Sequence, residues 1–152
     1  AVNRGSTGGI QFYIGSSLIL DTGANAFSAN TWNHLAVARS GTSLKMFVNG
    51  SVEVTATNSG NITVGNSNVS VGYDVQGTNN YFNGSLSNVR IVKGAAVYTS
   101  AFTPTTAPLT AITNTQLLTC QSNRFVDNSA SARTLTLAGN PSISQPQFMT
   151  QP

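Results

Sequence analysis

Charged side chains are scarce in this sequence. Asp, Glu, Lys and Arg make up 7% of the 152 residues, whereas about a quarter of an average soluble protein is charged. The seven Lys and Arg residues outnumber the four acids, but they are scattered and form neither a basic run nor a cluster interleaved with aromatic residues. This pattern argues against a nucleic-acid-binding surface, so we expect no nucleic-acid partner.

Cysteine and histidine occur once each, as Cys120 and His34. A single cysteine cannot form an internal disulfide, and it leaves the redox compartment open. A single histidine without a nucleophile-elbow motif does not provide the pattern of a catalytic triad. We therefore expect Cys120 to be a small buried apolar residue and His34 to have a structural role.

Closely spaced pairs of acids are missing as well. The acids are Asp21, Glu53, Asp74 and Asp127, and each is isolated in the sequence. Glycoside hydrolysis normally needs two carboxylates that face the scissile bond. Because no stretch places two acids close together, we expect that the chain is not an enzyme.

Long apolar runs are absent too. None approaches the roughly 18 residues that a membrane-spanning helix needs, and the first residues, "AVNRGSTGG", do not form a signal peptide. We therefore expect a soluble protein with no membrane partner. The chain begins with Ala1 rather than Met, which indicates that it was processed or cut from a longer polypeptide.

Short apolar runs separated by turn residues fill the sequence instead. Examples are "IQFYI", "SLIL", "LKMFV", "VSVGY" and "TLTLAG", with Gly, Asn, Ser and Thr between them. No window has a 3.6-residue apolar stripe, and these polar residues interrupt every candidate helix. The pattern predicts an all-β protein, an antiparallel two-sheet sandwich of the jelly-roll type.

The segment "TWNHLAVARSGTSLKMFVNGSVEVTA" has the strongest local pattern. Asn49 and Gly50 lie between two alternating runs, and Asn-Gly favours a two-residue type I′ turn, whose central residues both have positive φ. The letters "RSGTS" mark an earlier turn in the same segment. We therefore expect a three-stranded meander over residues 32–56, with Trp32 and Phe47 in the core or at its edge.

Two motifs resemble a known family. The letters "WNHLAVARSGTSLKMFVNG" resemble the laminin-G-like, concanavalin-A-like jelly-roll pattern of Trp, His, an apolar run, a short turn, an aromatic residue and Asn-Gly. Downstream, "YFNGSLSNVRIVKGAAVYTSAFTP" resembles a late strand of that family. The resemblance implies a jelly-roll fold. It leaves the function open, because this fold hosts lectins, adhesion modules and glucanases.

The C-terminal part resembles a segment that follows such modules in structural proteins of marine tailed bacteriophages. The resemblance implies a non-enzymatic virion module in a tail fibre, an appendage or a capsid decoration, exposed on the particle surface. Its expected partners are other virion proteins or copies of itself, together with host surface glycans. The alternative is a carbohydrate-binding lectin or adhesion domain outside a virion.

The same resemblance divides the chain into two parts. Residues 1–104 are expected to be a laminin-G-like core that lacks early strands of the family. Residues 105–152 are expected to be a Pro- and Thr-rich linker and a β segment, with strands in "LLTCQSNRFVDN" and "TLTLAG". This segment either completes the sandwich or begins a next module. A sandwich without its edge strands exposes unpaired backbone groups, so we expect the tail or a neighbouring subunit to cover them.

The loop "YDVQGTNNYF" is the candidate site for a glycan. Its amides and carboxylate supply hydrogen-bond donors and acceptors, and its tyrosines offer flat faces for a sugar ring. The candidate ligand-binding residues are Asp74, Gln76, Asn79, Asn80 and Tyr81.

Related laminin-G-like domains often hold calcium at the rim of a sheet, and this resemblance implies a candidate calcium site. Its ligands would be Asp74 and Asn79, with Asp21 as a further carboxylate if folding brings the two loops together. Calcium usually needs six to eight oxygen ligands and more than one carboxylate. The loop has one carboxylate, so a solvated polar turn without a cofactor is the alternative.

Overall fold

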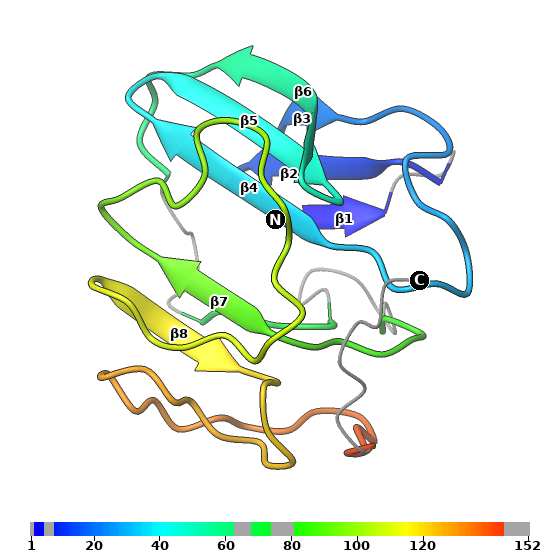
Figure 1. Ribbon diagram of the computed structural model, residues 1–152, viewed down its shortest axis with the longest axis vertical. Coiled ribbons are helices and arrows are strands. Elements are labelled where there is room, and N and C mark those ends of the chain that lie inside the picture. Colours follow the sequence, from blue (N-terminus) through cyan, green and yellow to red (C-terminus); the bar gives the residue numbers. More distant parts are fainter. Residues whose placement is uncertain (1, 5–7, 63–67, 74–80, 145–152) are drawn as a thin grey trace. The chain divides into compact units, whose positions relative to one another are not determined.

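All regular structure in this protein is β. The computed structural model describes residues 2–4, 8–62, 68–73 and 81–144. No helix occurs among these residues, so none of them forms a helix that could cross a membrane. Two compact units make up the chain: residues 1–65 with 95–104, and residues 66–94 with 105–152. The expected all-β, antiparallel architecture is confirmed for the described residues (Figure 1).

The first sheet of the first unit has the strand order β1-β2-β3. It comprises β1 (Val2–Arg4), β2 (Ile10–Ile14) and β3 (Ser17–Asp21), all antiparallel. β2 and β3 are joined by a two-residue turn in which Gly15 has a φ of 60°. The pairing shifts register between Phe12 and Tyr13, so that Phe12 pairs with Leu20 and Tyr13 with Leu18.

The second sheet is the meander expected from the sequence. It comprises β4 (Leu35–Ser40), β5 (Ser43–Val48) and β6 (Ser51–Thr57), in the order β4-β5-β6. Asn49 and Gly50 have φ values of 50° and 84°, which confirms the predicted turn with two positive φ angles. The first strand begins later than expected, because Asn33 donates hydrogen bonds to backbone oxygens of the preceding loop. Trp32 therefore lies outside the strand and is half-buried.

One apolar core joins the two sheets of this unit. Residues of β2 and β3 meet residues of β5, and the buried members are Ile10, Leu20, Leu44 and Met46. Leu44 and Met46 alternate along β5, so they lie on the same face of the strand. Each such buried side chain stabilises the fold by roughly 1.5–3 kcal/mol.

A second apolar cluster covers the end of β5 near the Asn49-Gly50 turn. Residues 95–104, which we call the strap, contribute Tyr98 and Phe102, whose rings stack at 3.6 Å with an interplanar angle of 5°. Both rings contact Phe47, which is 0% exposed. The expected core position of Phe47 is confirmed. The strap is the yellow-green segment that runs across the second sheet in Figure 1.

Gly50 allows the strap to approach the turn. The backbone N–H of Phe102 donates to the backbone oxygen of Gly50 at 3.0 Å. A Cβ atom on Gly50 would lie 1.9 Å from the backbone oxygen of Phe102. Gly50 is therefore required both by the positive φ of the turn and by the close approach of the strap.

The second unit is built around β7 (Val89–Val92) and β8 (Thr115–Thr119), which pair antiparallel. Asn88 and Arg90 also hold the segment before β8: Leu109 N–H donates to Asn88 Oδ1 at 2.8 Å, and Arg90 Nη1 donates to the Thr110 backbone oxygen at 3.2 Å. A strand of the tail thus pairs with a strand that precedes the strap. The division of the chain at Pro104 stays a prediction.

The tail forms fewer strands than the sequence predicts. The letters "LLTC" contribute to β8, but "RFVD" and "TLTLAG" form no strand. The chain after β8 is held by the side chain of Asp127 instead of by a strand ladder. One Asp127 oxygen accepts the Leu118 N–H, while the Asn128 N–H donates to the Leu118 backbone oxygen at 2.7 Å.

The Asp127 carboxylate is buried and fully engaged in hydrogen bonds. Its donors, each at 2.9 Å, are the backbone N–H groups of Leu118, Ser129 and Arg133 and the Ser129 hydroxyl. Burial alone would raise the pKa of this carboxyl, but the hydrogen bonds outweigh burial and lower its pKa to about 2.

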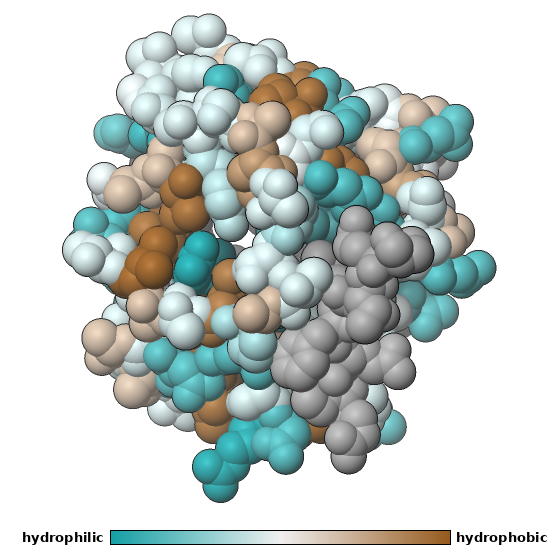
Figure 2. All heavy atoms as spheres, viewed as in Figure 1, coloured by the Kyte–Doolittle hydropathy of each residue, from teal (hydrophilic) through white to brown (hydrophobic). Residues whose placement is uncertain are grey.

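Neutral polar groups are common on the face of the molecule that Figure 2 shows. In Figure 2 most of the coloured surface is pale, the hydropathy of Ser, Thr and Gly, and strongly hydrophilic and hydrophobic residues are spread among them. This agrees with a sequence in which only 7% of residues are charged. The described surface therefore has hydroxyl and amide groups, rather than dense charge, available for contacts.

Replacing Gly50 by Ala should destabilise the protein by more than the same change at Gly41. Both glycines have positive φ, which costs an alanine roughly 1 kcal/mol. Only Gly50 has a backbone atom in the place of the new Cβ, whereas nothing lies within 4 Å of that position at Gly41. Urea unfolding of both variants measures the difference. Equal losses of stability would contradict the close approach of the strap.

Replacing Asp127 by Asn should destabilise the protein at pH 7 by roughly 2 kcal/mol, because the lowered pKa stabilises the folded state by about that much. A lowered folded pKa contributes stability above the unfolded value of 3.8, and this contribution is lost as the pH falls through about 2. The difference between wild type and variant should therefore shrink between pH 5 and pH 2. Urea unfolding across this range measures it, and a constant difference would contradict the role of the carboxylate.

Candidate functional site

The loop predicted to bind a glycan lies mostly outside the described residues. Asp74, Gln76, Asn79 and Asn80 belong to this part, so their roles stay predictions. Tyr81 is described, together with Tyr73 at the other end of the loop. The structure thus defines the base from which the loop extends.

The two tyrosines form a stacked pair at the base of the loop. Tyr73 and Tyr81 are paired by an isolated antiparallel bridge, and their ring centroids are 4.8 Å apart at an interplanar angle of 27°. Tyr81 remains 50% exposed. Gly139 approaches it closely, since a Cβ atom there would lie 2.9 Å from Tyr81 Cε1. The pair therefore has a fixed geometry and a half-exposed ring.

Phe82 follows this pair and is 55% exposed. Phe82 Cβ lies 3.9 Å from the position that a Cβ atom would have on Gly72, whereas the Tyr81 ring stacks on Tyr73, so the two side chains have different neighbours. The Phe82 N–H donates to the Gly72 backbone oxygen at 2.8 Å, which holds the second strand of the loop base. Phe82 is thus an exposed ring near the candidate site but not part of the tyrosine pair.

Asp21, the further carboxylate of the candidate calcium site, ends β3 in the first unit. It is exposed and accepts hydrogen bonds from Gln11 Nε2 at 2.7 Å and from the Gly23 N–H at 2.8 Å. These bonds, that from Gln11 first, lower its pKa. No group of three His, Cys, Asp or Glu residues in the described part is arranged to hold a metal. The Asp21 oxygens thus serve their own sheet, and a calcium site with Asp74 and Asn79 stays a prediction.

His34 is held in the aromatic cluster of the strap. Its ring contacts Phe102 edge-on at 5.3 Å, its Nδ1 atom is buried without a hydrogen-bond partner among the described residues, and its backbone N–H donates to Asn49 Oδ1 at 2.8 Å. Desolvation lowers the pKa of the imidazole. A neutral, ring-packed histidine beside the turn agrees with the structural role predicted for it.

Three further titratable side chains, Asp21, Asp127 and Cys120, have shifted pKa values. A general acid in a glycosidase needs a raised pKa, whereas the pKa values of Asp21 and Asp127 are lowered. Burial raises the pKa of the half-buried Cys120 thiol, which favours the unreactive form. The lowered pKa values of Asp21 and Asp127 do not suit a general acid, and the raised pKa of Cys120 does not suit a thiolate nucleophile.

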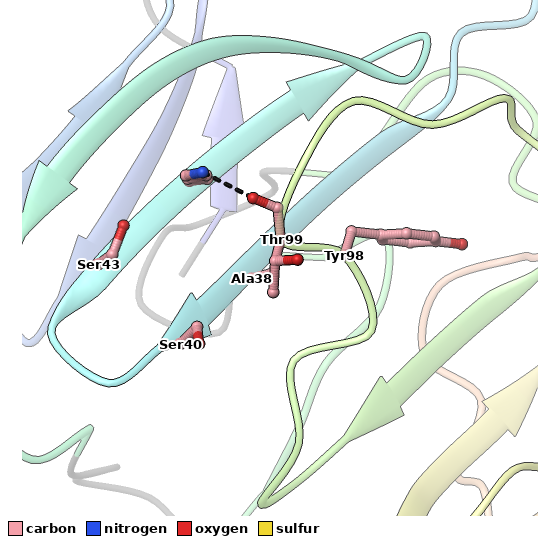
Figure 3. A pocket seen from close by; sticks show the side chains of 6 residues that line it. Ala38, Ser40, Ser43, Tyr98 and Thr99 are labelled. Atoms are coloured by element: carbon pink, nitrogen blue, oxygen red, sulfur yellow. Dashed lines mark hydrogen bonds between the residues drawn. The ribbon is translucent and has the colours of Figure 1, made fainter.

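A hollow of about 210 Å³ lies on the second sheet beside the strap (Figure 3). Its lining residues are Ala38, Ser40, Ser43, Lys45, Tyr98 and Thr99. The sequence analysis did not identify this hollow. Alternation along β5 indicates that Lys45 points away from the core, but no sequence signal places Thr99 against it.

The comparisons with known proteins agree with this β architecture. A laminin-G-type family model, described as the concanavalin A-like lectin/glucanases superfamily, matches residues 2–106. The chain belongs to this superfamily. No curated protein and no solved structure matches the chain.

Membership in the concanavalin A-like superfamily confirms the resemblance of the first two thirds of the chain. It implies a jelly roll, in which antiparallel sheets pack face to face. In the first unit, one buried cluster contains residues of both sheets. The superfamily includes both lectins and glucanases. Membership alone therefore leaves the choice between binding and hydrolysis to the chemistry of the site.

Proposed function

We propose that this chain is a non-enzymatic carbohydrate-binding module that contacts host surface glycans from the virion of a tailed phage. The observation that carries the proposal is the stacked pair of Tyr73 and Tyr81, whose outer ring is half exposed at the base of a polar loop. Sugar rings bind to flat aromatic faces, with neighbouring polar side chains fixing their orientation. The chain's membership in a superfamily that includes lectins supports this function.

The binding chemistry suits a protein with few charges. Hydrogen bonds and ring contacts, rather than long-range attraction, would provide the affinity, so binding at the tyrosine pair should depend little on salt. A single shallow site of this kind binds weakly. Many copies on one particle would raise the avidity by 10²-fold or more, as is general for linked sites.

The absence of hydrolysis is part of the proposal. Retaining and inverting glycosidases both use two carboxyl groups, one of them with a raised pKa. The described acids instead have lowered pKa values where a shift is found, and Asp127 has its carboxylate occupied by four donors. The carboxylates of Asp21 and Asp127 are thus engaged in structural hydrogen bonds.

The placement on a virion rests on the sequence resemblance of the tail to segments in phage structural proteins. The neutral polar surface supports it, because such a surface tolerates close packing of many copies without charge repulsion. The proposed partners are other virion proteins or copies of this chain. The proposed location of the module is a tail fibre, an appendage or a capsid decoration on the particle surface.

Replacing Tyr81 by Ala should lower glycan binding by about tenfold, because an aromatic contact contributes roughly 1 kcal/mol or more. Tyr81→Phe should bind like the wild type if ring contact dominates. The measurement is binding of a tetrameric form of the full chain to an array of bacterial surface polysaccharides. The change Phe82→Ala is the matched control, since it removes an exposed ring that is not part of the tyrosine pair.

The polar part of the loop has its own variant in the same assay. Changing Asp74, Asn79 and Asn80 together to Ala should reduce binding without lowering the melting temperature, because the sequence predicts a polar turn for these residues. If the Tyr81→Ala variant and this triple variant both bind like the wild type, the loop is not the contact site.

The virion placement predicts a fixed number of copies of this chain in purified particles. Quantitative mass spectrometry of intact particles measures that ratio against a known capsid protein. A virion module gives a constant ratio through repeated purification, because it is built into the particle. A lectin that acts outside a virion would be lost in these steps.

A further inference from the structure

The hollow of the first unit is formed by one face of the second sheet and by the strap. Ala38 pairs with Lys45 and Ser40 pairs with Ser43, so these four side chains lie on the same face of β4 and β5. The strap adds Tyr98 and Thr99 from a distant part of the sequence. The hollow is therefore a product of the folded unit rather than of one loop.

Among the described residues that line the hollow, Lys45 is the only charged one. Its Nζ atom donates to the backbone oxygen of Thr99 at 2.6 Å, a neutral partner. An ammonium group has three donors, so two remain for a ligand. The nearest acid by strand register is Glu53 on β6, two residues from Thr55, the pairing partner of Lys45. Glu53 is exposed and is not among the residues that line the hollow. The positive charge is thus not neutralised within the hollow.

Three hydroxyl side chains share the lining of the hollow with this charge. Ser40, Ser43 and Thr99 line the hollow, and each hydroxyl both donates and accepts hydrogen bonds. Figure 3 shows Ser40 and Ser43 near the β4–β5 turn and Thr99 beside the lysine nitrogen, to which a dashed line marks the hydrogen bond. A ligand here would meet one cation and several neutral polar groups.

No aromatic face is offered to the ligand. In Figure 3 the ring of Tyr98 points away from Ser40 and Ser43, and this ring is stacked on Phe102. The volume of about 210 Å³ is also below the roughly 300–1,000 Å³ of pockets for drug-sized ligands. The hollow therefore suits a single charged group with its neighbouring hydroxyls, and not an extended or stacked ligand.

We infer that this hollow binds the anionic group of an acidic saccharide, a uronate carboxylate or a sulfate ester, with Lys45 as its charged partner. The inference rests on the proposed glycan-binding function for the choice of a saccharide. We choose an anionic group because the described lining contains one cation and several hydroxyls and no acid. This hollow is separate from the tyrosine pair, so the module has two sites that differ in chemistry.

The test uses the full chain with two matched ligands, tetragalacturonate and its methyl ester, which lacks the negative charges. Wild-type protein should bind the acid at least tenfold more tightly than the ester in titration calorimetry, and this preference should decline from about 50 to about 500 mM NaCl. A sulfated tetrasaccharide of galactose forms the second arm, which distinguishes a sulfate site from a carboxylate site. Equal binding of acid and ester, or no binding of any acidic ligand, would overturn the inference.

Two variants of the hollow assign the effect to Lys45. Lys45→Gln keeps a donor for the Thr99 oxygen but removes the charge, so it should bind acid and ester alike, whereas Lys45→Arg should keep the preference. Ser43→Asp leaves the Lys45–Thr99 hydrogen bond in place and adds a negative charge, so it should reject the acid even if Lys45→Gln loosens the strap. Retained preference in a Ser43→Asp protein that melts cooperatively would overturn the inference.

One further variant distinguishes the proposal for the tyrosine pair from the inference about the hollow. Tyr81→Ala should keep the preference for tetragalacturonate while it loses binding to neutral glycans on the array. If Tyr81→Ala has no effect on the array and Lys45→Gln still removes the acid preference, the tyrosine proposal fails and the hollow stands. If Tyr81→Ala lowers binding on the array but Lys45→Gln keeps the preference for the acid, the inference about the hollow fails and the tyrosine proposal stands.

Discussion

The close contact between the strap and the Asn49-Gly50 turn is the constraint on which the first unit depends. Because Gly50 has no Cβ, the backbone of Phe102 can approach it and donate a hydrogen bond. That approach places the stacked rings of Tyr98 and Phe102 over Phe47 and beside His34. The burial of an aromatic core residue thus follows from one glycine in a hairpin turn.

The same contact creates the hollow. Once the strap lies across β5, Thr99 is in reach of Lys45, and the hydrogen bond between them closes one side of a polar cavity. A meander without the strap would leave this face of the sheet open to water. The packing of aromatic rings at one end of the strap and the hollow at its middle are therefore consequences of one backbone path.

Hydrogen bonds from neutral donors, rather than ion pairs, stabilise the Asp127 carboxylate of the second unit. Asp127 receives four donors from the backbone and from one serine, and it holds the chain next to β8 where a further strand would otherwise be needed. Buried carboxylates are stable only when their oxygens are satisfied in this way. In a protein with few charges, one well-placed acid can organise a long segment that has no regular structure.

Local sequence patterns determined much of this protein. The Asn-Gly pair and the alternation along β5 were enough to predict the meander, its turn and the core position of Phe47, because these depend on backbone conformations that neighbouring residues control. The start of β4 at Leu35 and the lack of strands in "RFVD" and "TLTLAG" were not predicted. Side-chain hydrogen bonds from Asn33 and to Asp127 decide them, and apolar patterning does not record such bonds.

For the two candidate sites as well, some features follow from the sequence and others only from tertiary structure. Tyr81 was identified from the sequence because its ring and the polar loop are neighbours along the chain. The stacking of Tyr81 on Tyr73 and the hollow around Lys45 were decided only by tertiary structure. Lys45 and Thr99 are 54 residues apart in sequence, and only the folding of the strap across the sheet brings the ammonium group to the backbone oxygen.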